Sequence, residues 1–429
     1  MPTYLRQNEL PRKLRWSGHS ARLLILESSK LGNIHSRAEE FANYTGATIS
    51  ISSVSIAQWQ NEVFFDAGHN GPRTFDGYSL KGNWIPSLVE DGGLADLSVL
   101  LQNDNNVWDD LEWTDIVPVV RDSISVYDGN VYSIPMDADY IVPAVRGDLL
   151  VKTEGNDGTT EHHTYSLDTW EEWVKFAEDQ HGRDLNGDGE PDYGSCIAKG
   201  DGQVHFSVFG AFWAIVAPHL QKEGREHGAF LNTTTFKPLW AEDNSSFVKA
   251  LELYKRLVKV SKEGEVTASD AKNLFQSGRC ATWLSLPGLV FGVLDTGGII
   301  NSTTATAKQY PPPGVECSSS DECPLAIDLS TEKESRLINR VPFWSSSGTG
   351  LSISSSAYED TQQLLLELFA YISAPAQSNE DVISRNTFSD PFRNSQLNEA
   401  ALDRLYQKNG WNKASAGKVL TQKTFDNTY

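Results

Sequence analysis

The chain has 429 residues, enough for two or three domains of about 150 residues or for one large two-lobed unit. Its hydrophobic fraction of 39% and its 12 Trp, 14 Tyr and 18 Phe exclude a disordered chain. The formal net charge of −21 repels phosphate backbones and anionic lipid headgroups, which argues against nucleic acid or a membrane surface as partner. The most apolar stretch, Val208 to Ala217, is far shorter than the roughly 20 residues that span a bilayer, so we expect no membrane span in this chain.

The first ordered segment predicts a strand, a helix and a second strand. Leu23 to Leu26 form a continuous apolar run, as in a buried parallel strand, and apolar residues then recur at helical spacing from Ile34 to Ala42. Gly46 ends this helix, and Ile49 and Ile51 then alternate with serines as they would in a strand. This change of period predicts an α/β fold in which a right-handed crossover returns the chain to a parallel sheet.

Three more helices are indicated downstream. Asp168 lies three residues before Glu171 in a pattern typical of a capping box, and the following helix places Trp170 and Trp173 on one packed face. Two further amphipathic helices are predicted, over 247–258 and over 364–372, and Pro375 acts as a stop signal for the second. The polar stretch from Gly297 to Arg340 contains three successive prolines and is typical of a long surface excursion.

The cysteines and glycosylation motifs indicate an oxidising, extracytoplasmic compartment. Cys317 and Cys323 close a short polar loop and are the expected disulfide, whereas a second bridge between Cys196 and Cys280 is left open. The chain also carries N-x-[ST] motifs in polar surroundings, which suit a chain that leaves the cytoplasm. These motifs begin at Asn43, Asn232, Asn244 and Asn301.

Several catalytic signatures are missing from the sequence. Gly348-Thr349-Gly350 has no third glycine, no Walker-type lysine follows a glycine loop, and there is no serine-hydrolase elbow or metalloprotease histidine pair. His162 and His163 lie in a polar run that favours a solvated loop. A carboxylate pair for glycoside hydrolysis stays open because only its separation in space decides.

One segment has the pattern of a calcium loop. From Asp184, oxygen-bearing side chains stand at positions 1, 3, 5 and 9 with Gly189 at position 6, but position 12 is Ser195 in place of a bidentate glutamate. The alternative is a turn that satisfies its own hydrogen bonds. The candidate ligands of a structural Ca²⁺ are Asp184, Asn186, Asp188, Glu190 and Asp192.

Taken together, these segments resemble the extracellular solute-binding proteins of the maltose-binding type, family 1, which serve ABC importers. The similarity extends in family order from about Ala21 to Leu397, and the order is more specific than any single block. The matching blocks are Arg22–Leu26, Arg37–Gly46, Asp76–Tyr78, Trp84–Pro86, Gly93–Leu97, Tyr127–Pro135, Arg146–Leu150, Thr169–Glu172, Asp184–Gly194, Phe275–Ala281 and Gly348–Ile353.

The resemblance implies an α/β, two-lobed, periplasmic-binding-protein-like type II fold whose lobes are joined by crossing hinge strands. The crossings would fall near Pro135–Asp137, Ala281–Leu284 and Ser347–Leu351. The first lobe would then comprise 20–136 plus 284–346, and the second 137–283 plus 347–429, with its C-terminal end truncated relative to the family.

The resemblance also implies a function: capture of a mono- or oligosaccharide in an interlobe cleft, with no catalysis and no required cofactor, for a membrane transporter. The alternatives are the ectodomain of a membrane receptor and, from another class, a carbohydrate-active enzyme. Aromatic faces stack on sugar rings and carboxylates accept hydroxyl protons, so these residue types near the crossings are the candidates. The candidate ligand-binding residues are Tyr78, Trp84, Asp137, Asp139, Tyr140, Trp283, Phe343 and Trp344, with Trp59, Trp240 and Arg393 as weaker candidates.

Overall fold

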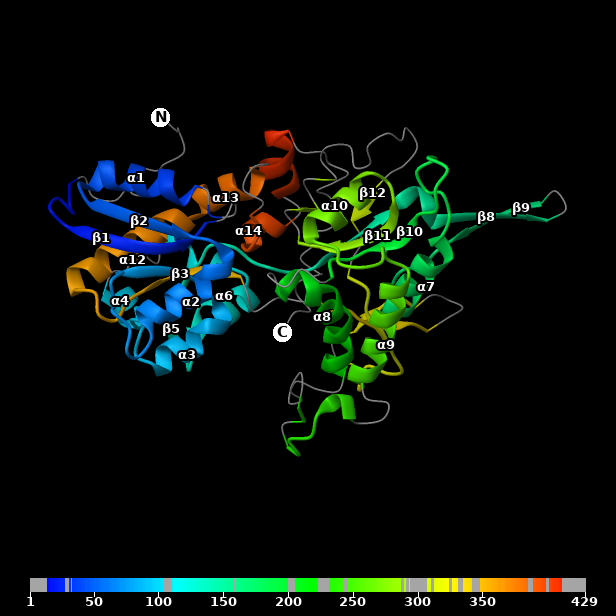
Figure 1. Ribbon diagram of the computed structural model, residues 1–429, viewed down its shortest axis with the longest axis horizontal. Helices are drawn as coiled ribbons and strands as arrows, with labels where there is room; N and C mark the ends of the chain where they lie inside the picture. Colours follow the sequence, from blue (N-terminus) through cyan, green and yellow to red (C-terminus); the bar gives the residue numbers. More distant parts are fainter. Residues whose placement is uncertain are drawn as a thin grey trace. The chain divides into compact units, whose positions relative to one another are not determined.

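The computed structural model describes two compact units (Figure 1). Unit 1 comprises Met1–Asp139 and Trp344–Leu405, and unit 2 comprises Tyr140–Phe343 and Tyr406–Tyr429. The residues described are 14–27, 31, 33–103, 110–156, 159–199, 205–222, 231–232, 234–241, 246–286, 289–290, 293, 307–309, 312–323, 326–330, 335–341, 348–384, 389–398 and 401–410.

Unit 1 is built on a five-stranded mixed sheet. Its strands run in the order β2 (Thr48–Val54), β1 (Ser20–Leu26), β3 (Gly77–Lys81), β16 (Thr349–Ile353) and β6 (Ile134–Pro135). β1 is parallel to β2 and β3, and β16 is antiparallel to β3 and β6. Leu23, Leu24 and Ile25 are buried, which confirms the predicted buried strand and the α/β fold.

Helices cover the sheet of unit 1, and the first of them ends where the sequence predicts. Gly46 takes the left-handed conformation at φ 79°, where glycine avoids the Cβ clash of other residues, and donates its N–H to Ala42 O. The predicted helix over 364–372 lies within α12, which ends at Ser373, and Pro375 opens the next helix. The helices are α1 (Ile34–Thr45), α2 (Ile56–Ala67), α3 (Ile85–Glu90), α4 (Leu97–Asn103), α6 (Pro118–Ile124), α12 (Glu359–Ser373), α13 (Pro375–Ile383) and α14 (Asn394–Leu397), with β4 (Val126–Tyr127) and β5 (Asn130–Val131) forming a small hairpin.

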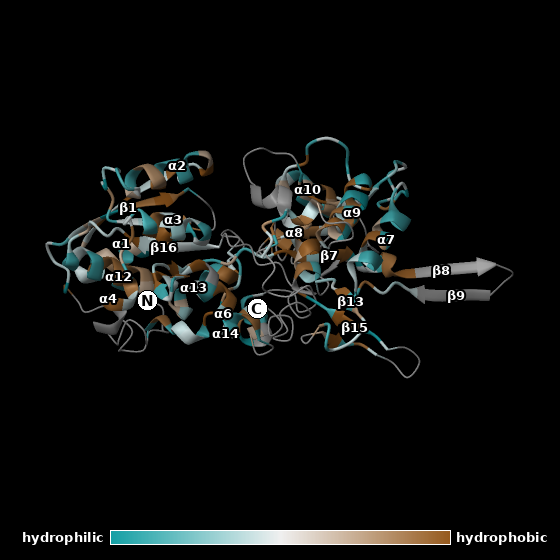
Figure 2. Ribbon diagram, turned by 90° about the horizontal axis from the view of Figure 1, so that it is seen from below, coloured by the Kyte–Doolittle hydropathy of each residue, from teal (hydrophilic) through white to brown (hydrophobic). Residues whose placement is uncertain are grey.

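Unit 2 has a four-stranded sheet with a core of its own. The strand order is β10 (Tyr193–Cys196), β11 (Cys280–Ser285), β7 (Val142–Arg146) and β12 (Ala307–Gln309). Hydrophobic residues gather in and around β7 and α8 (Figure 2). The helices are α7 (Trp170–Gln180), α8 (His205–Lys222), α9 (Ser246–Lys259) and α10 (Ala268–Gln276).

The start of α7 corrects one prediction and confirms another. The capping box is formed by Thr169 and Glu172, one residue later than predicted, because the Thr169 hydroxyl accepts from the Glu172 N–H and the Glu172 carboxylate accepts from the Thr169 N–H. Trp170 and Trp173 are buried in the core of unit 2, as their spacing predicts. The predicted helix over 247–258 lies within α9.

The described part of the 297–340 stretch contains short strands. β13 (Val315–Cys317), β15 (Leu337–Asn339) and β14 (Ile327–Asp328) form a three-stranded antiparallel sheet. The predicted Cys317–Cys323 disulfide is present, and so is the Cys196–Cys280 disulfide that the sequence left open.

Two further findings concern the segment of His162 and His163 and the length of the apolar helices. His162 and His163 lie in β9 (Thr159–Thr164), which pairs with β8 (Val151–Asn156) in an antiparallel hairpin, so the predicted loop is wrong. Within the described part of the chain, no helix is both long and apolar enough to cross a membrane.

The distribution of segments between the units differs from the predicted lobes. β12 pairs with β7 and thus belongs to unit 2, whereas the prediction put 284–346 in the first lobe. β16 bridges β3 and β6 and belongs to unit 1, whereas the prediction put 347–429 in the second lobe. β11 lies inside the sheet of unit 2 with β10 and β7 on its two sides, so the chain does not change unit at 281–284.

Candidate functional site

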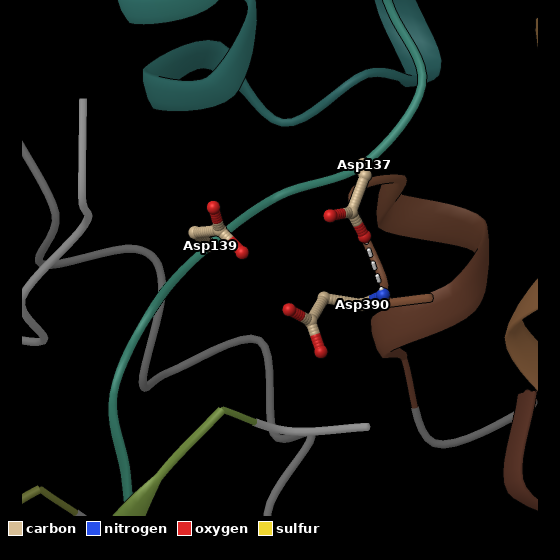
Figure 3. A group of neighbouring side chains, drawn as sticks. All are labelled: Asp137, Asp139 and Asp390. Atoms are coloured by element: carbon tan, nitrogen blue, oxygen red, sulfur yellow. Dashed lines mark hydrogen bonds between the residues drawn. The ribbon is translucent and has the colours of Figure 1, made fainter. Parts of the chain in front are cut away.

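Three aspartates of unit 1 gather beside the segment that leaves β6. One carboxylate oxygen from each of Asp137, Asp139 and Asp390 lies within 4.8 Å of those from the other two. Asp137 and Asp390 are fully buried and Asp139 is half-buried. Figure 3 shows Asp137 and Asp139 on one extended segment, with Asp390 facing them from a segment far along the chain. We call this group the aspartate cluster.

Backbone contacts hold the two segments of the aspartate cluster together. The Asp390 N–H donates to Asp137 Oδ1 at 2.7 Å, which ties the second segment directly to a cluster carboxylate (Figure 3). Met136 N donates to Thr349 O at 2.9 Å, which ties the first segment to β16. The cluster therefore rests on main-chain hydrogen bonds to strands and loops of unit 1, the kind of support that fixes side chains for binding.

A glycine makes the close approach of β16 possible. A Cβ atom on Gly348 would lie 2.8 Å from Asp137 O and 2.1 Å from Ile124 Cδ1, distances that real Cβ atoms essentially never show. A Cβ on Gly350 would lie 2.0 Å from Ser133 Oγ. The Gly348-Thr349-Gly350 motif thus serves chain packing next to the aspartate cluster, because a side chain at either glycine would push the two strands apart.

The aspartate cluster offers carboxyl oxygens that can accept hydrogen bonds. Ionised carboxylates only accept hydrogen bonds, and each such bond is stronger than one between neutral groups. Three of them close together favour a ligand that brings several donors, such as the hydroxyl groups of a polyol, or a positive charge. In the described residues this is the one group of three or more His, Cys, Asp or Glu side chains whose ligand atoms come this close.

The structure brings together two of the predicted ligand-binding residues, Asp137 and Asp139, and adds Asp390. Sequence reasoning missed Asp390, although the resemblance covers the stretch that contains it. The available signal was an acid between Ser389 and Pro391, in a mostly polar segment that also holds Phe388 and Phe392. One acid among 57 gives no reason to single it out.

The predicted aromatic residues of unit 1 lie in its core in this structure. Tyr78 is fully buried and its hydroxyl donates to Asp66 Oδ2 at 2.7 Å, and burial raises the pKa of the phenol well above its ordinary value. Trp59 Nε1 donates to Ser79 O at 2.9 Å, and its ring packs edge-on against Trp84 with centroids 4.6 Å apart. All three side chains make the contacts of core residues here.

The predicted aromatic residues of unit 2 have different environments. Tyr140 and Trp283 are buried, and the Trp283 ring lies 5.3 Å from that of Phe275. Trp240 is half exposed in the short helix η5 (Leu239–Ala241). Phe343, and Trp344 of unit 1, lie outside the described residues.

Arg393 has no solvent-exposed surface, and its side chain contacts other protein groups of the described residues. Its guanidinium donates to Ser378 Oγ at 3.1 Å, Glu112 O at 3.3 Å and Ser373 O at 2.5 Å. Burial lowers the pKa of Arg393 to about 10 despite the nearby Asp115 carboxylate. In this conformation the Arg393 guanidinium is committed to protein acceptors.

The predicted calcium loop is a turn that satisfies itself. Asp184 Oδ1 accepts from Gly187 N at 2.7 Å, and Asp184 Oδ2 accepts from Gly189 N at 2.9 Å. Asp188 Oδ1 accepts from Glu190 N, and Asp192 Oδ1 forms an ion pair with Arg279 Nε at 2.8 Å. Asn186 also bonds within the loop. These hydrogen bonds are those of the alternative that the sequence offers, an Asx-rich turn, and each carboxylate oxygen keeps a further lone pair that a cation could use.

The comparison with known families decides the identity. The family model described as bacterial extracellular solute-binding protein matches residues 31–314, about two thirds of the chain. The chain belongs to this family. Recognition of the family from the order of its sequence blocks is thereby confirmed. Comparison of this solute-binding protein with curated proteins gives no match.

Solved structures confirm the two-lobed fold of solute-binding proteins. An ABC transporter solute-binding protein from Agrobacterium radiobacter K84, in complex with ribitol, has a TM-score of 0.64 and 17% identity over 97% of this chain and 88% of its own. One from Agrobacterium vitis S4, with bound D-mannitol, has a TM-score of 0.61 and 16% identity over 96% and 84%. Maltose-bound MalE3 from T. maritima has a TM-score of 0.57 and 16% identity over 91% and 86%.

Proposed function

We propose that this protein captures a sugar or sugar alcohol at the aspartate cluster and delivers it to an ABC-type importer. The observation that carries the proposal is the gathering of Asp137, Asp139 and Asp390 within 4.8 Å. The family supports a binding role, and the similar structures that hold ribitol, D-mannitol and maltose support a polyhydroxylated solute.

The chemistry of the cluster favours a ligand with several hydroxyl groups. Each carboxylate can accept more than one hydroxyl hydrogen, and charge-assisted hydrogen bonds contribute about 1.5–3 kcal/mol each. Because Asp137 and Asp390 are buried, those bonds would form away from competing water. A compact polyol would reach Asp139 first, and would reach Asp137 and Asp390 once the segments that cover them move.

The compartment and partner follow from the same proposal. The protein would act outside the cytoplasm, where the Cys196–Cys280 and Cys317–Cys323 disulfides form and persist. Its partner would be a membrane transporter that accepts the loaded protein. Capture and delivery need no covalent chemistry, which fits a family of binding proteins.

Calorimetric titration tests the proposal with ribitol, D-mannitol, maltose and D-tagatose, and with Ca²⁺ and spermidine as cationic competitors. We expect one or more of the polyhydroxylated compounds to bind, and Asp139→Asn to weaken that binding at least about tenfold, or 1.4 kcal/mol. Asp122→Asn is the matched control, since Asp122 is an exposed acid of the same unit. Binding of a cation alone, or an unchanged Kd in Asp139→Asn, would contradict the proposal.

A further inference from the structure

The last residue of α12 contacts both segments that carry the aspartate cluster. The Ser373 hydroxyl donates to Pro135 O at 2.6 Å, two residues before Asp137. The Ser373 carbonyl accepts from Arg393 Nη2 at 2.5 Å, three residues after Asp390. One residue therefore links, through its side chain and its main chain, two stretches that lie about 250 residues apart in sequence.

Arg393 fixes its segment from several directions. Besides Ser373 O, its guanidinium donates to Ser378 Oγ in α13 and to Glu112 O next to η3 (Trp113–Asp115). Main-chain contacts add to this, since Val117 N donates to Phe392 O at 3.0 Å. A planar guanidinium with fixed donor directions holds its acceptors in one geometry, which a flexible ammonium does not.

The side chains of Arg393 and Ser373 are buried, and this burial carries a desolvation penalty. Arg393 has no exposed surface and Ser373 is 1% exposed. Taking a guanidinium out of water is unfavourable, and a well-packed apolar residue is often as stable or more so at such a place. The buried arginine fixes the geometry between α12, α13 and the segment of Asp390.

We propose that Arg393 and Ser373 are positioning residues that set the distance between Asp137 and Asp390, and thereby the affinity of the aspartate cluster for a polyhydroxylated solute. The inference rests on the proposed function. Arg393 acts through Asp390, and Ser373 acts through both segments. Sequence reasoning placed Arg393 against the ligand, whereas here its part is to hold a residue that contacts the ligand.

The experiment compares Ser373→Ala and Arg393→Lys with Thr45→Ala. Thr45 is the matched control because it too is a fully buried hydroxyl at the last residue of a helix, α1, and donates to a carbonyl oxygen, that of Phe41 at 2.8 Å. Ser373→Ala removes one hydrogen bond and no bulk, so it keeps the test open should Arg393→Lys fail to fold.

Two readouts are taken on each folded variant. The first is the Kd for D-mannitol, or for whichever panel compound binds the wild type best. The second, measured without any solute, is the NMR shift and hydrogen-exchange rate of the Asp390 amide, which donates to Asp137 Oδ1 and so reports their approach. We expect Ser373→Ala and Arg393→Lys to raise the Kd about tenfold and to speed exchange of this amide by a similar factor, with both unchanged in Thr45→Ala.

The outcomes separate the two proposals. Wild-type Kd and wild-type Asp390 exchange in Ser373→Ala would overturn the positioning role. If the wild type binds no compound of the panel, the proposed function fails, and the Asp390 amide alone decides the positioning role. Faster Asp390 exchange with an unchanged Kd would overturn the link between this geometry and affinity.

Discussion

Arg37 Nη2 lies 2.9 Å from Asp381 Oδ1 and so joins α1 to α13 across 344 residues of sequence. Both side chains are nearly buried, with 7% and 10% of their surface exposed. Arg37 also donates to Gln377 O at 2.8 Å, and Asn33 Nδ2 donates to the same Asp381 carboxylate. This ion pair attaches the second chain segment of unit 1 to the first.

Breaking this pair should destabilise unit 1 strongly. We expect Arg37→Leu to lower the free energy of unfolding by about 3–5 kcal/mol, because it leaves the Asp381 carboxylate buried without its cation. The double variant Arg37→Leu/Asp381→Leu should lose less than the sum of the single changes. Denaturant unfolding measures both, with Arg121→Leu at an exposed pair as control. Additive losses would contradict the coupling.

The loss of unfolding free energy in Arg37→Leu should also depend on pH. Burial raises the pKa of Asp381 above its ordinary value, and Arg37 counteracts this rise. A carboxyl whose folded pKa is raised stabilises the fold below its ordinary pKa of about 3.9 and loses that contribution as pH rises through the folded value. The difference in unfolding free energy between the wild type and Arg37→Leu should be largest at neutral pH and smaller in acid. Unfolding free energies measured between pH 4 and pH 7 test this.

For the Glu178–Arg256 pair, we expect a pH dependence of stability with the opposite sign. Hydrogen bonding from Arg256 lowers the pKa of Glu178, so the contribution of the pair is fully present above the ordinary glutamate pKa of about 4.3. It should be lost as pH falls through the lowered value. Since Glu178 is partly exposed, Glu178→Gln should cost no more than about 1 kcal/mol at pH 7 and nothing at pH 2. A cost that persists in acid would point to packing instead of charge.

The two disulfides should contribute unequally to unit 2. Cys196 and Cys280 are 84 residues apart, whereas Cys317 and Cys323 are six apart. Loop-closure entropy then gives about 4–5 kcal/mol for the first bridge and about 2 kcal/mol for the second. Paired Cys→Ser replacements followed by thermal unfolding test this order. A larger loss from the short loop would mean that native contacts outweigh chain entropy.

Gly348→Ala should impair both packing and binding. The added methyl group would meet the Asp137 carbonyl and Ile124, so β16 or the Asp137 segment must move. We expect a loss of about 1–3 kcal/mol of stability and weaker binding of the panel compounds. Gly264→Ala is the control, because Gly264 has a positive φ of 75° with open space around it, so strain arises there without any clash. Equal binding losses in both variants would refute a local effect.

The sequence predicts the fold well where a signal is local. The switch from helical to strand period around Gly46 and the amphipathic pattern of 247–258 correspond to α1, β2 and α9. The two compact units divide the chain differently from the predicted lobes, because the strand pairing of β12 and β16 depends on contacts distant in sequence that no local pattern encodes.

The candidate site was predictable only in part, for a similar reason. Asp137 and Asp139 follow a strand that the family blocks identify, whereas Asp390 reaches them through tertiary packing alone. Aromatic residues such as Tyr78 and Trp59 serve core packing here, and a sequence does not distinguish a buried ring from a ring that stacks on a sugar. The stretch from Asp184 showed a metal-like spacing, but the same spacing also suits a closed turn.

The position of β16 in the first sheet has a consequence for synthesis of the protein. β6 joins that sheet only through β16, although β6 ends at residue 135 and β16 begins at residue 349. The ribosome must therefore make all of 140–343 before the sheet of unit 1 can be completed. At about 5–20 residues per second, the first 139 residues wait at least ten seconds for β16, the strand that joins β6 to the sheet. An N-terminal unit that completes its sheet this late stays incompletely folded during most of the synthesis of the chain.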